Sequence, residues 1–513
     1  MNLNKILSVI LCYISICVPC FAHKSSTQIN PLTRAMLDGY ASLLEQNPND
    51  YLTLFERASQ YYRLDNYDKA LSDIKRALSC TPAKEKAQLA SEYGLLADIY
   101  IQLARYTDAF EAIDNALDLS PGSYSLLYQK GNVCLHLNQY KDAANAFTAM
   151  QRINPRSAEA LFGLARAAAM ENKTEEAQTF LNDAVKLDPS NYLTFCRRAD
   201  VYHLMDMNAQ AAADYLNAFS ISSGAERPMR GLMDLAREDF NAVDQAIDYA
   251  ISKTQNVVPL YFLSGNAAVE AGLYTEAYNA YRQLMSNISE EEAIPLYPTL
   301  SKICLRRGNI DEADTYATKA MLAKSDLESN LLKATIEQAR GNFTSAAMYA
   351  KAALSIAPSN HDAILRAAEI SYCTNNMQDA LAYLNEAILN DATAADALLF
   401  RGFIQANKTG NKEAALSDYL RVTHIPASSF EDITNKAIAQ EKSGMSLDAI
   451  ATIAPVQAAA DKNAKAAYLT AIYLPSTDKN EEASQMLEKA QDLGFEDIYL
   501  LKYYNRPLFN ISE

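Results

Sequence analysis

Apolar residues recur at helical spacings in the segment 124–155, YSLLYQKGNVCLHLNQYKDAANAFTAMQRINP. Large residues such as Leu127 and Cys134 lie seven positions apart, which places them on one face of a helix. The polar turn HLNQYKDA follows, and a second apolar series runs on to Pro155, where a helix must end. The segment therefore predicts two short amphipathic helices joined by a tight turn.

The same unit recurs along most of the chain and can be counted from one alanine that follows each inter-helix turn. Successive alanines are 33 to 39 residues apart, with one interval of 66 that fits two repeats and has Gly231 and Val243 at the equivalent places. We therefore expect thirteen repeats. The alanines are Ala70, Ala109, Ala143, Ala177, Ala211, Ala277, Ala313, Ala346, Ala380, Ala414, Ala449 and Ala483.

A second small residue stands twelve positions before each of these alanines. Two antiparallel helices can approach closely only where both lack bulk at the crossing, so the pairing of small residues predicts packed helix pairs. These crossing residues are Ala58, Ala97, Gly131, Ala165, Ala199, Gly265, Ser301, Ala334, Ala368, Gly402, Ala437 and Ala471. The turns between them, such as EAGLYTEA and CTNNMQDA, contain Gly or Asn, which tolerate the left-handed conformation that closes a helix.

The two ends of the chain differ from the repeats. Residues 1–22 combine Lys5, an apolar run and a short CFA ending, which is typical of an export signal. Cys20 leaves a second interpretation open, in which it is the lipidated first residue of a lipoprotein. The remaining chain divides into a flexible stretch and capping helix (23–50), a first repeat array (51–223), a degenerate repeat (224–257), a second array (258–490) and a C-terminal cap (491–513).

Composition excludes several classes of protein. The 513 residues are 49% hydrophobic and 21% charged, which excludes wholesale disorder, and no later segment is apolar enough to span a membrane. A formal net charge of -16 argues against nucleic acid as a partner, because no broad basic face can neutralise phosphates.

Candidate chemistry is equally sparse. The five histidines follow no metal-ligand spacing, and we expect no metal, no cofactor and no catalytic residues. We interpret the five cysteines beyond the signal as buried single thiols, because their wide spacing fits neither a disulfide framework nor a zinc site. They are Cys80, Cys134, Cys196, Cys304 and Cys373.

The order of large, small, Tyr, Ala, aromatic, Ala and Pro positions resembles the tetratricopeptide repeat family over residues 51–497, although the Trp that the family prefers is absent. The resemblance implies an all-α, right-handed superhelical solenoid of antiparallel helix pairs, with a concave groove lined by the first helix of each pair. Asn132 and Asn266 match the asparagine with which family members hydrogen-bond an extended peptide. The groove residues expected to contact a partner are Phe55, Tyr62, Tyr128, Asn132, Phe162, Arg166, His203, Phe262, Asn266, Tyr372 and Phe403.

From these observations we expect a non-catalytic scaffold, exported to the periplasm or cell envelope, that binds a protein or an extended peptide. Two alternatives stay open. One is a ligand-capture component of a nutrient-uptake system, anchored by lipid at Cys20. The other is an accessory subunit of an envelope complex whose catalyst is another chain.

Overall fold

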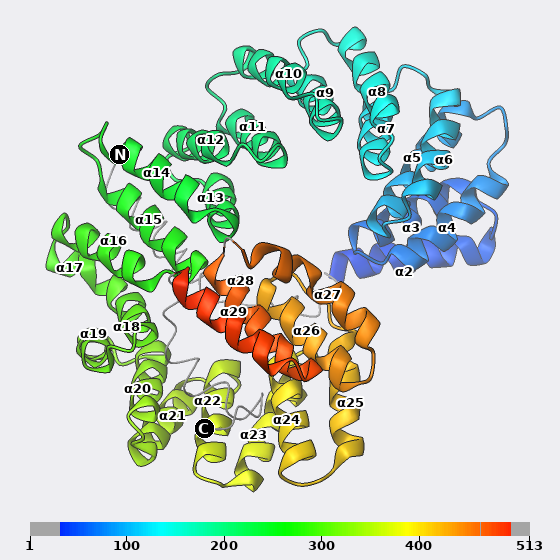
Figure 1. Ribbon diagram of the computed structural model, residues 1–513. Helices are drawn as coiled ribbons and strands as arrows, with labels where there is room; N and C mark the ends of the chain where they lie inside the picture. The colour runs from blue at the N-terminus through cyan, green and yellow to red at the C-terminus, as the bar shows by residue number, and fades with distance from the viewer. Residues whose placement is uncertain (1–30, 462, 494–513) are drawn as a thin grey trace. The chain divides into compact units, whose positions relative to one another are not determined.

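The computed structural model describes residues 31–461 and 463–493. Their regular structure consists of α-helices and two short 3-10 turns, and the helices pack in successive antiparallel pairs (Figure 1). The predicted all-α array of helix pairs is thereby confirmed. The export signal, Cys20, the stretch 23–30 and the end of the C-terminal cap (494–513) lie outside the described residues.

The chain divides into two compact units, the first ending at Pro228 and the second beginning at Met229. The first unit starts with the single helix α2 (Pro31–Gln46), in the segment where the sequence predicts a capping helix. Five helix pairs follow: α3 (Tyr51–Arg63) with α4 (Tyr67–Cys80), α5 (Lys86–Gln102) with α6 (Tyr106–Leu119), α7 (Tyr124–His136) with α8 (Tyr140–Ile153), α9 (Ala158–Met170) with α10 (Thr174–Leu187), and α11 (Tyr192–Leu204) with α12 (Asn208–Ile221).

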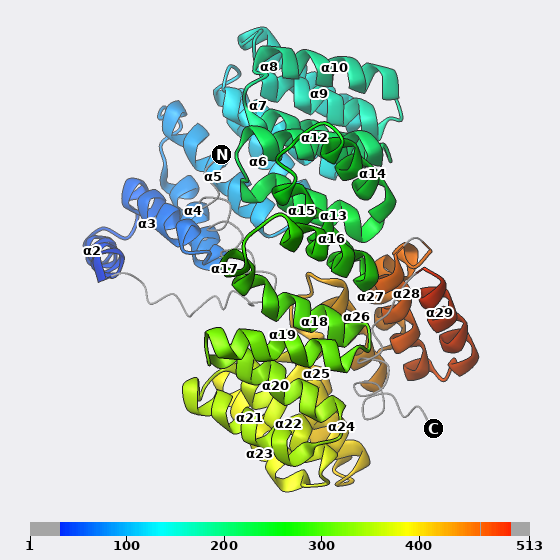
Figure 2. The same ribbon diagram turned by 90° about the vertical axis from the view of Figure 1, so that its left-hand side faces the viewer.

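The boundary between the units falls within α13 (Glu226–Glu238), which α14 (Phe240–Ile251) follows. Seven more pairs complete the second unit, and Figure 2 shows α18 to α23 stacked one pair on the next. They are α15 (Val258–Ala271) with α16 (Tyr274–Ser286), α18 (Tyr297–Arg306) with α19 (Ile310–Ala323), α20 (Leu327–Ala339) with α21 (Phe343–Ile356), α22 (His361–Cys373) with α23 (Met377–Asn390), α24 (Ala395–Asn407) with α25 (Lys412–Thr423), α26 (Phe430–Lys442) with α27 (Ser446–Ala459), and α28 (Ala464–Tyr473) with α29 (Asn480–Asp492). Short turns of helix lie at α17 (Glu290–Ala293), η1 (Ile294–Leu296) and η2 (Leu474–Thr477).

The predicted crossing residues explain why the pairs form. All twelve are buried in the structure, which lets the two backbones of each pair approach closely. Ser301, the one hydroxyl among them, donates a hydrogen bond of 2.8 Å to the carbonyl oxygen of Ala313 on the facing helix. One of the alanines that follow the inter-helix turns was predicted wrongly, because Ala415 and not Ala414 is the buried alanine of α25. The turn before it, which contains Lys408, Thr409 and Gly410, is one residue longer than the usual turn.

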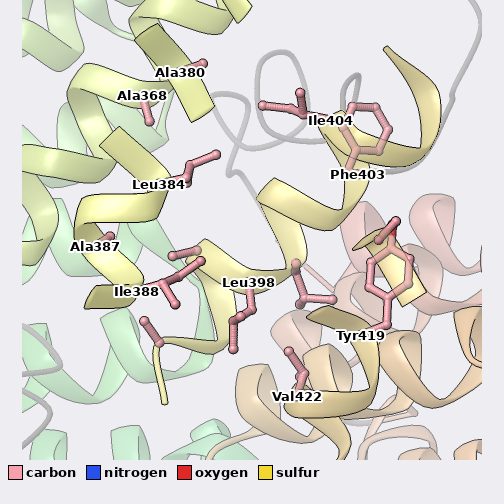
Figure 3. Packing of buried hydrophobic residues seen from close by; sticks show 14 of the residues in the cluster. Ala368, Ala380, Leu384, Ala387, Ile388, Leu398, Phe403, Ile404, Tyr419 and Val422 are labelled. Atoms are coloured by element: carbon pink, nitrogen blue, oxygen red, sulfur yellow. The ribbon is translucent and has the colours of Figure 1, made fainter. Parts of the chain in front are cut away.

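Neighbouring pairs share one hydrophobic core. In the cluster of Figure 3, Leu384 of α23 is fully buried with Leu398 and Ile404 of α24, and Tyr419 of α25 closes the cluster. Each pair therefore completes the core of the next, as in other repeat arrays.

The turns follow the predicted chemistry except where Asp or Ala takes the place of Asn or Gly. Asn138, Asn375 and Gly272 have positive φ angles, as expected for Asn and Gly at the end of the first helix. The same position is Asp65 in the first repeat and Ala104 in the second, where φ is 56° and 54°. Ala104 has no side-chain polar group to compensate for this conformation, so it carries local strain.

The segment of the degenerate repeat forms two helices, and the prediction for the cysteines holds only in part. The segment around Gly231 forms the ordinary helices α13 and α14, with Met229 and Leu232 in the core. Among the five cysteines, all of which are free thiols, Cys134, Cys196 and Cys304 are buried as expected, whereas Cys80 is half-buried and Cys373 is exposed. The interpretation of Cys373 as buried was wrong, because it occupies the last position of α22, where the helix ends at the turn.

Candidate functional site

The first unit has a hollow on the first helices of three successive pairs, in which α9 contacts both α7 and α11. Its volume is about 400 Å³. The lining residues are Tyr128, Asn132, Glu159, Phe162, Gly163, Arg166, Arg197, Asp200, Val201 and Leu204. Four of them, Tyr128, Asn132, Phe162 and Arg166, are groove residues that the sequence predicts.

A row of polar residues at the spacing of the repeat contributes three members to this hollow and has its first member, Asp98, outside the lining. Asp98, Asn132, Arg166 and Asp200, which we call the polar row, each follow a crossing residue directly and are 34 positions apart. Because equivalent positions of stacked repeats face the same way, one polar side chain from each first helix is presented on the same surface. Sequence reasoning had missed Asp98, although the spacing of 34 leads to it directly.

The floor of the hollow depends on the ring of Phe147, which is fully buried in α8. Gly131 and Gly163 lie against this ring from α7 and α9, and a methyl group added at either glycine would come within 2.5 Å of Phe147 Cε1. Gly163 therefore has to lack a side chain, since such contacts are far inside van der Waals distance. The position was not singled out from the sequence, because the constraint comes from the ring and not from a turn.

The predicted groove asparagine is engaged within the protein. Arg166 Nη1 donates a hydrogen bond of 3.0 Å to Asn132 Oδ1, and Asn132 Nδ2 donates one of 3.1 Å to the carbonyl oxygen of Tyr128. Both ends of this amide are therefore held in place. A ligand backbone would compete with these bonds or use the remaining donors of Arg166.

The acidic ends of the polar row are also partnered. Asp200 accepts hydrogen bonds from the hydroxyl of Tyr215 at 2.6 Å and from Arg227 Nη2 at 2.6 and 2.8 Å. Burial, together with the negative charge of Asp200, raises the pKa of Tyr215 well above its ordinary value. At the other end, burial raises the pKa of Asp98, although Gln129 donates a hydrogen bond to its carboxylate.

Aromatic rings supply the apolar part of the surface. Tyr128 is 40% exposed and meets Phe147 edge-on, whereas Phe162 is only 5% exposed. The guanidinium of Arg197 lies over the Phe162 ring, 5.9 Å from its centroid. The hollow thus combines one exposed ring, a covered ring and flanking guanidinium groups, which suits an extended chain with mixed side chains.

The other predicted groove residues lie elsewhere. In the first unit, Phe55 and Tyr62 are half-buried against the core of α3 to α6, and His203 Nδ1 lies 3.1 Å from Asn208 Oδ1. Neither α3 residue lines the hollow, and His203 does not either, although α11 carries it.

In the second unit the predicted groove residues Phe262, Asn266 and Phe403 are buried. Tyr281 fills the crossing opposite Gly265, packs edge-on against Phe262 and donates a hydrogen bond of 2.7 Å to Asn266 Oδ1. Tyr372 is half-buried and packs edge-on against Phe403, with ring centroids 6.3 Å apart. These residues serve the core, because the bulky ring of the second helix reaches through the crossing.

Other kinds of site were sought over residues 31–461 and 463–493. No group of three or more His, Cys, Asp or Glu side chains there could hold a metal ion. In the same part of the chain, no helix is both long and apolar enough to cross a membrane.

Comparison with known families agrees with the helix pairs. Two tetratricopeptide repeat models match the chain, one over residues 95–155 and the other over residues 135–197. The chain is a tetratricopeptide repeat protein. The matched residues contain α7, α9 and the first six residues of α11, so all of the lining residues of the hollow except Asp200, Val201 and Leu204 lie on identified repeats.

Similar solved structures are found at low sequence identity and low TM-score. A tetratricopeptide repeat protein from Parabacteroides merdae is 20% identical over 53% of this chain and 92% of its own, with a TM-score of 0.35. YrrB, described as a tetratricopeptide repeat protein with an unusual peptide-binding site, is 20% identical over 38% of this chain and 97% of its own, with a TM-score of 0.30. A structure of Naa15/Naa10 bound to HypK-THB matches 92% of this chain and 93% of its own at 14% identity, with a TM-score of 0.38.

Proposed function

We propose that this tetratricopeptide repeat protein is a non-catalytic scaffold, exported to the cell envelope, that binds an extended peptide or protein segment in the hollow of α7, α9 and α11. The observation that carries the proposal is the hollow of about 400 Å³, in which the exposed Tyr128 lies beside the polar row. A ring buries a large area at low entropic cost, and the polar row offers donors and acceptors to a peptide backbone.

The proposal is tested with the double variant Tyr128→Ala, Asn132→Ala. It removes the exposed ring and the amide of the hollow, so we expect loss of the bound partner in affinity capture from a cell-envelope extract. The matched control is Tyr249→Ala, which removes a tyrosine that is 68% exposed on α14, outside the hollow. Circular dichroism and thermal melting of both proteins should stay close to those of the wild type. Equal capture by the double variant and the control would refute binding in the hollow.

Export and anchoring need a separate measurement. Mass spectrometry of the protein isolated from its host gives the mature N-terminus. A chain that starts at His23 supports the exported scaffold, and a lipid-modified Cys20 supports the alternative of an anchored ligand-capture component. An N-terminus at Met1 would contradict both forms of the export proposal. An accessory role in an envelope complex requires that affinity capture retain an enzyme as the partner.

A further inference from the structure

Arg166 stands out among the charged groups of the hollow because its hydrogen-bond partner is a neutral amide. Its Nη1 donates to Asn132 Oδ1, and no carboxylate of the described residues lies within 4.0 Å of its guanidinium. A guanidinium has five donors, of which this bond uses one. The remaining donors lie on a residue that lines the hollow and is half-exposed.

Arg197 is only loosely paired. Its Nη2 lies 3.8 Å from Glu159 Oε1, which is too long for a hydrogen bond, and both side chains are nearly half-exposed at 45% and 47%. Exposed pairs of this kind contribute little energy, so a better-placed carboxylate could displace Glu159. The Phe162 ring beneath the guanidinium keeps it over the hollow.

The acidic residues of the hollow do not offset these two cations. Asp200 is held by both of its hydrogen-bond partners, Arg227 and Tyr215, which leaves Glu159 as the one lining carboxylate opposite Arg166 and Arg197. Because Arg227 already neutralises Asp200, the charged groups in and around the hollow carry one positive charge in excess, within a chain whose formal net charge is -16. At physiological ionic strength charges more than about 8 Å apart are largely screened, so the local excess decides what binds.

We propose that the hollow accepts an aspartate or glutamate side chain of the bound peptide, held between Arg166 and Arg197. This inference rests on the proposed function and adds the chemistry of the ligand. A planar guanidinium binds a carboxylate with two parallel hydrogen bonds, and such charge-assisted bonds are among the strongest available to a peptide side chain. Tyr128 and Phe162 would then contact the residues that flank the acidic one.

The probe is a random peptide library displayed on phage and selected on the full chain. Selection on the Tyr128→Ala, Asn132→Ala variant runs in parallel and removes peptides that bind elsewhere. We expect the remaining peptides to share an acidic residue at one position. A synthetic peptide of the best sequence is then compared with an analogue in which that residue is replaced by its amide, and the analogue should bind about tenfold more weakly.

Protein variants show whether the two arginines cause the preference. Arg166→Gln and Arg197→Gln should each weaken binding of the acidic peptide and should remove most of the difference between acid and amide peptides. The control Arg152→Gln removes an exposed arginine on α8, outside the hollow, and should leave both affinities unchanged. Arg166→Glu paired with a peptide that carries lysine at the selected position should recover binding, which a purely structural role for Arg166 would not produce.

The outcomes separate the two claims. Peptides that depend on Tyr128 and Asn132 but bind equally well as acid and amide would overturn the inference and leave the proposed function standing. A selection that enriches nothing on the wild type over the double variant would overturn the proposed function, and the inference with it.

Discussion

Replacing Gly163 by alanine tests whether the ring of Phe147, which packs beneath Gly163, fixes the floor of the hollow. In an ordinary helix interior this change stabilises by about 1 kcal/mol, because alanine has the better helix propensity. At Gly163 the new methyl group would lie 2.5 Å from Cε1 of Phe147, whereas carbon atoms prefer about 3.5–4.0 Å. The ring would have to move by about 1 Å.

The ring has no room to move, because Gly131 lies against it on the α7 side. Overpacking of this kind costs about 1–3 kcal/mol, which exceeds the propensity gain, so we expect a net loss of about 1–2 kcal/mol. Gly94→Ala is the matched control. Gly94 lies in the interior of α5, and its added methyl group would meet Leu126 Cδ2 at an ordinary 3.5 Å, so this variant should gain up to about 1 kcal/mol.

Urea unfolding followed by circular dichroism gives the overall change, and hydrogen exchange of the α7 to α10 amides shows whether the loss is local. The double variant Gly163→Ala, Phe147→Leu supplies a second check, because a smaller side chain leaves space for the methyl group. Its loss should be smaller than the sum of the two single losses. If Gly163→Ala stabilises the protein as much as Gly94→Ala does, the explanation of the floor is wrong.

Three further predictions concern stability. Ala104→Gly should raise the free energy of unfolding by about 0.5–1 kcal/mol, because glycine adopts the φ of 54° without strain. Thermal melting measures the change, and an unchanged or lower melting temperature would show that no strain is stored at this position. Asp214→Ala should lower the free energy of unfolding, measured in urea, by about 3 kcal/mol, because it leaves Arg198 without the carboxylate that binds it at 2.6 and 2.7 Å. The double variant Arg198→Met, Asp214→Leu should recover most of this loss. An Asp214→Ala variant as stable as the wild type would refute the role of the pair. Glu92 is fully buried, and burial raises the pKa of its carboxyl above the ordinary 4.5. The stabilising contribution of Glu92 is therefore complete below pH 4.5 and is lost as the pH rises through the folded-state pKa. Glu92→Gln should therefore be more stable than the wild type at neutral pH, with an advantage that shrinks as the pH falls, and parallel pH profiles of the two proteins would contradict this reasoning.

The sequence predicts the helix pairs well, because the paired small residues recur in nearly constant phase and report a contact within one repeat. Ser301 and Ala313 are an example, because these two residues of one predicted crossing form a hydrogen bond in the structure. An error arises where one extra residue in a turn moves the phase, as at Ala415.

The candidate site was predicted less completely, because exposure depends on neighbouring side chains and not on helix phase alone. Tyr128 and Asn266 were both predicted to face the groove from their positions on the helix. Asn266 is nevertheless buried and accepts a hydrogen bond from Tyr281. Arg166 bonds to an amide, and Arg197 lies 3.8 Å from the carboxylate of Glu159. Both arrangements depend on distances between repeats, which the order of residues along one helix does not determine.

The spacing of 34 in the polar row also has an evolutionary consequence. Deletion or duplication of one whole repeat would leave every helix crossing intact, because each crossing lies inside a single unit. The same event would remove or add one member of the row and so change the order of charges that a ligand meets. Arrays of this kind can therefore exchange specificity by gaining or losing whole units, without any substitution in the core.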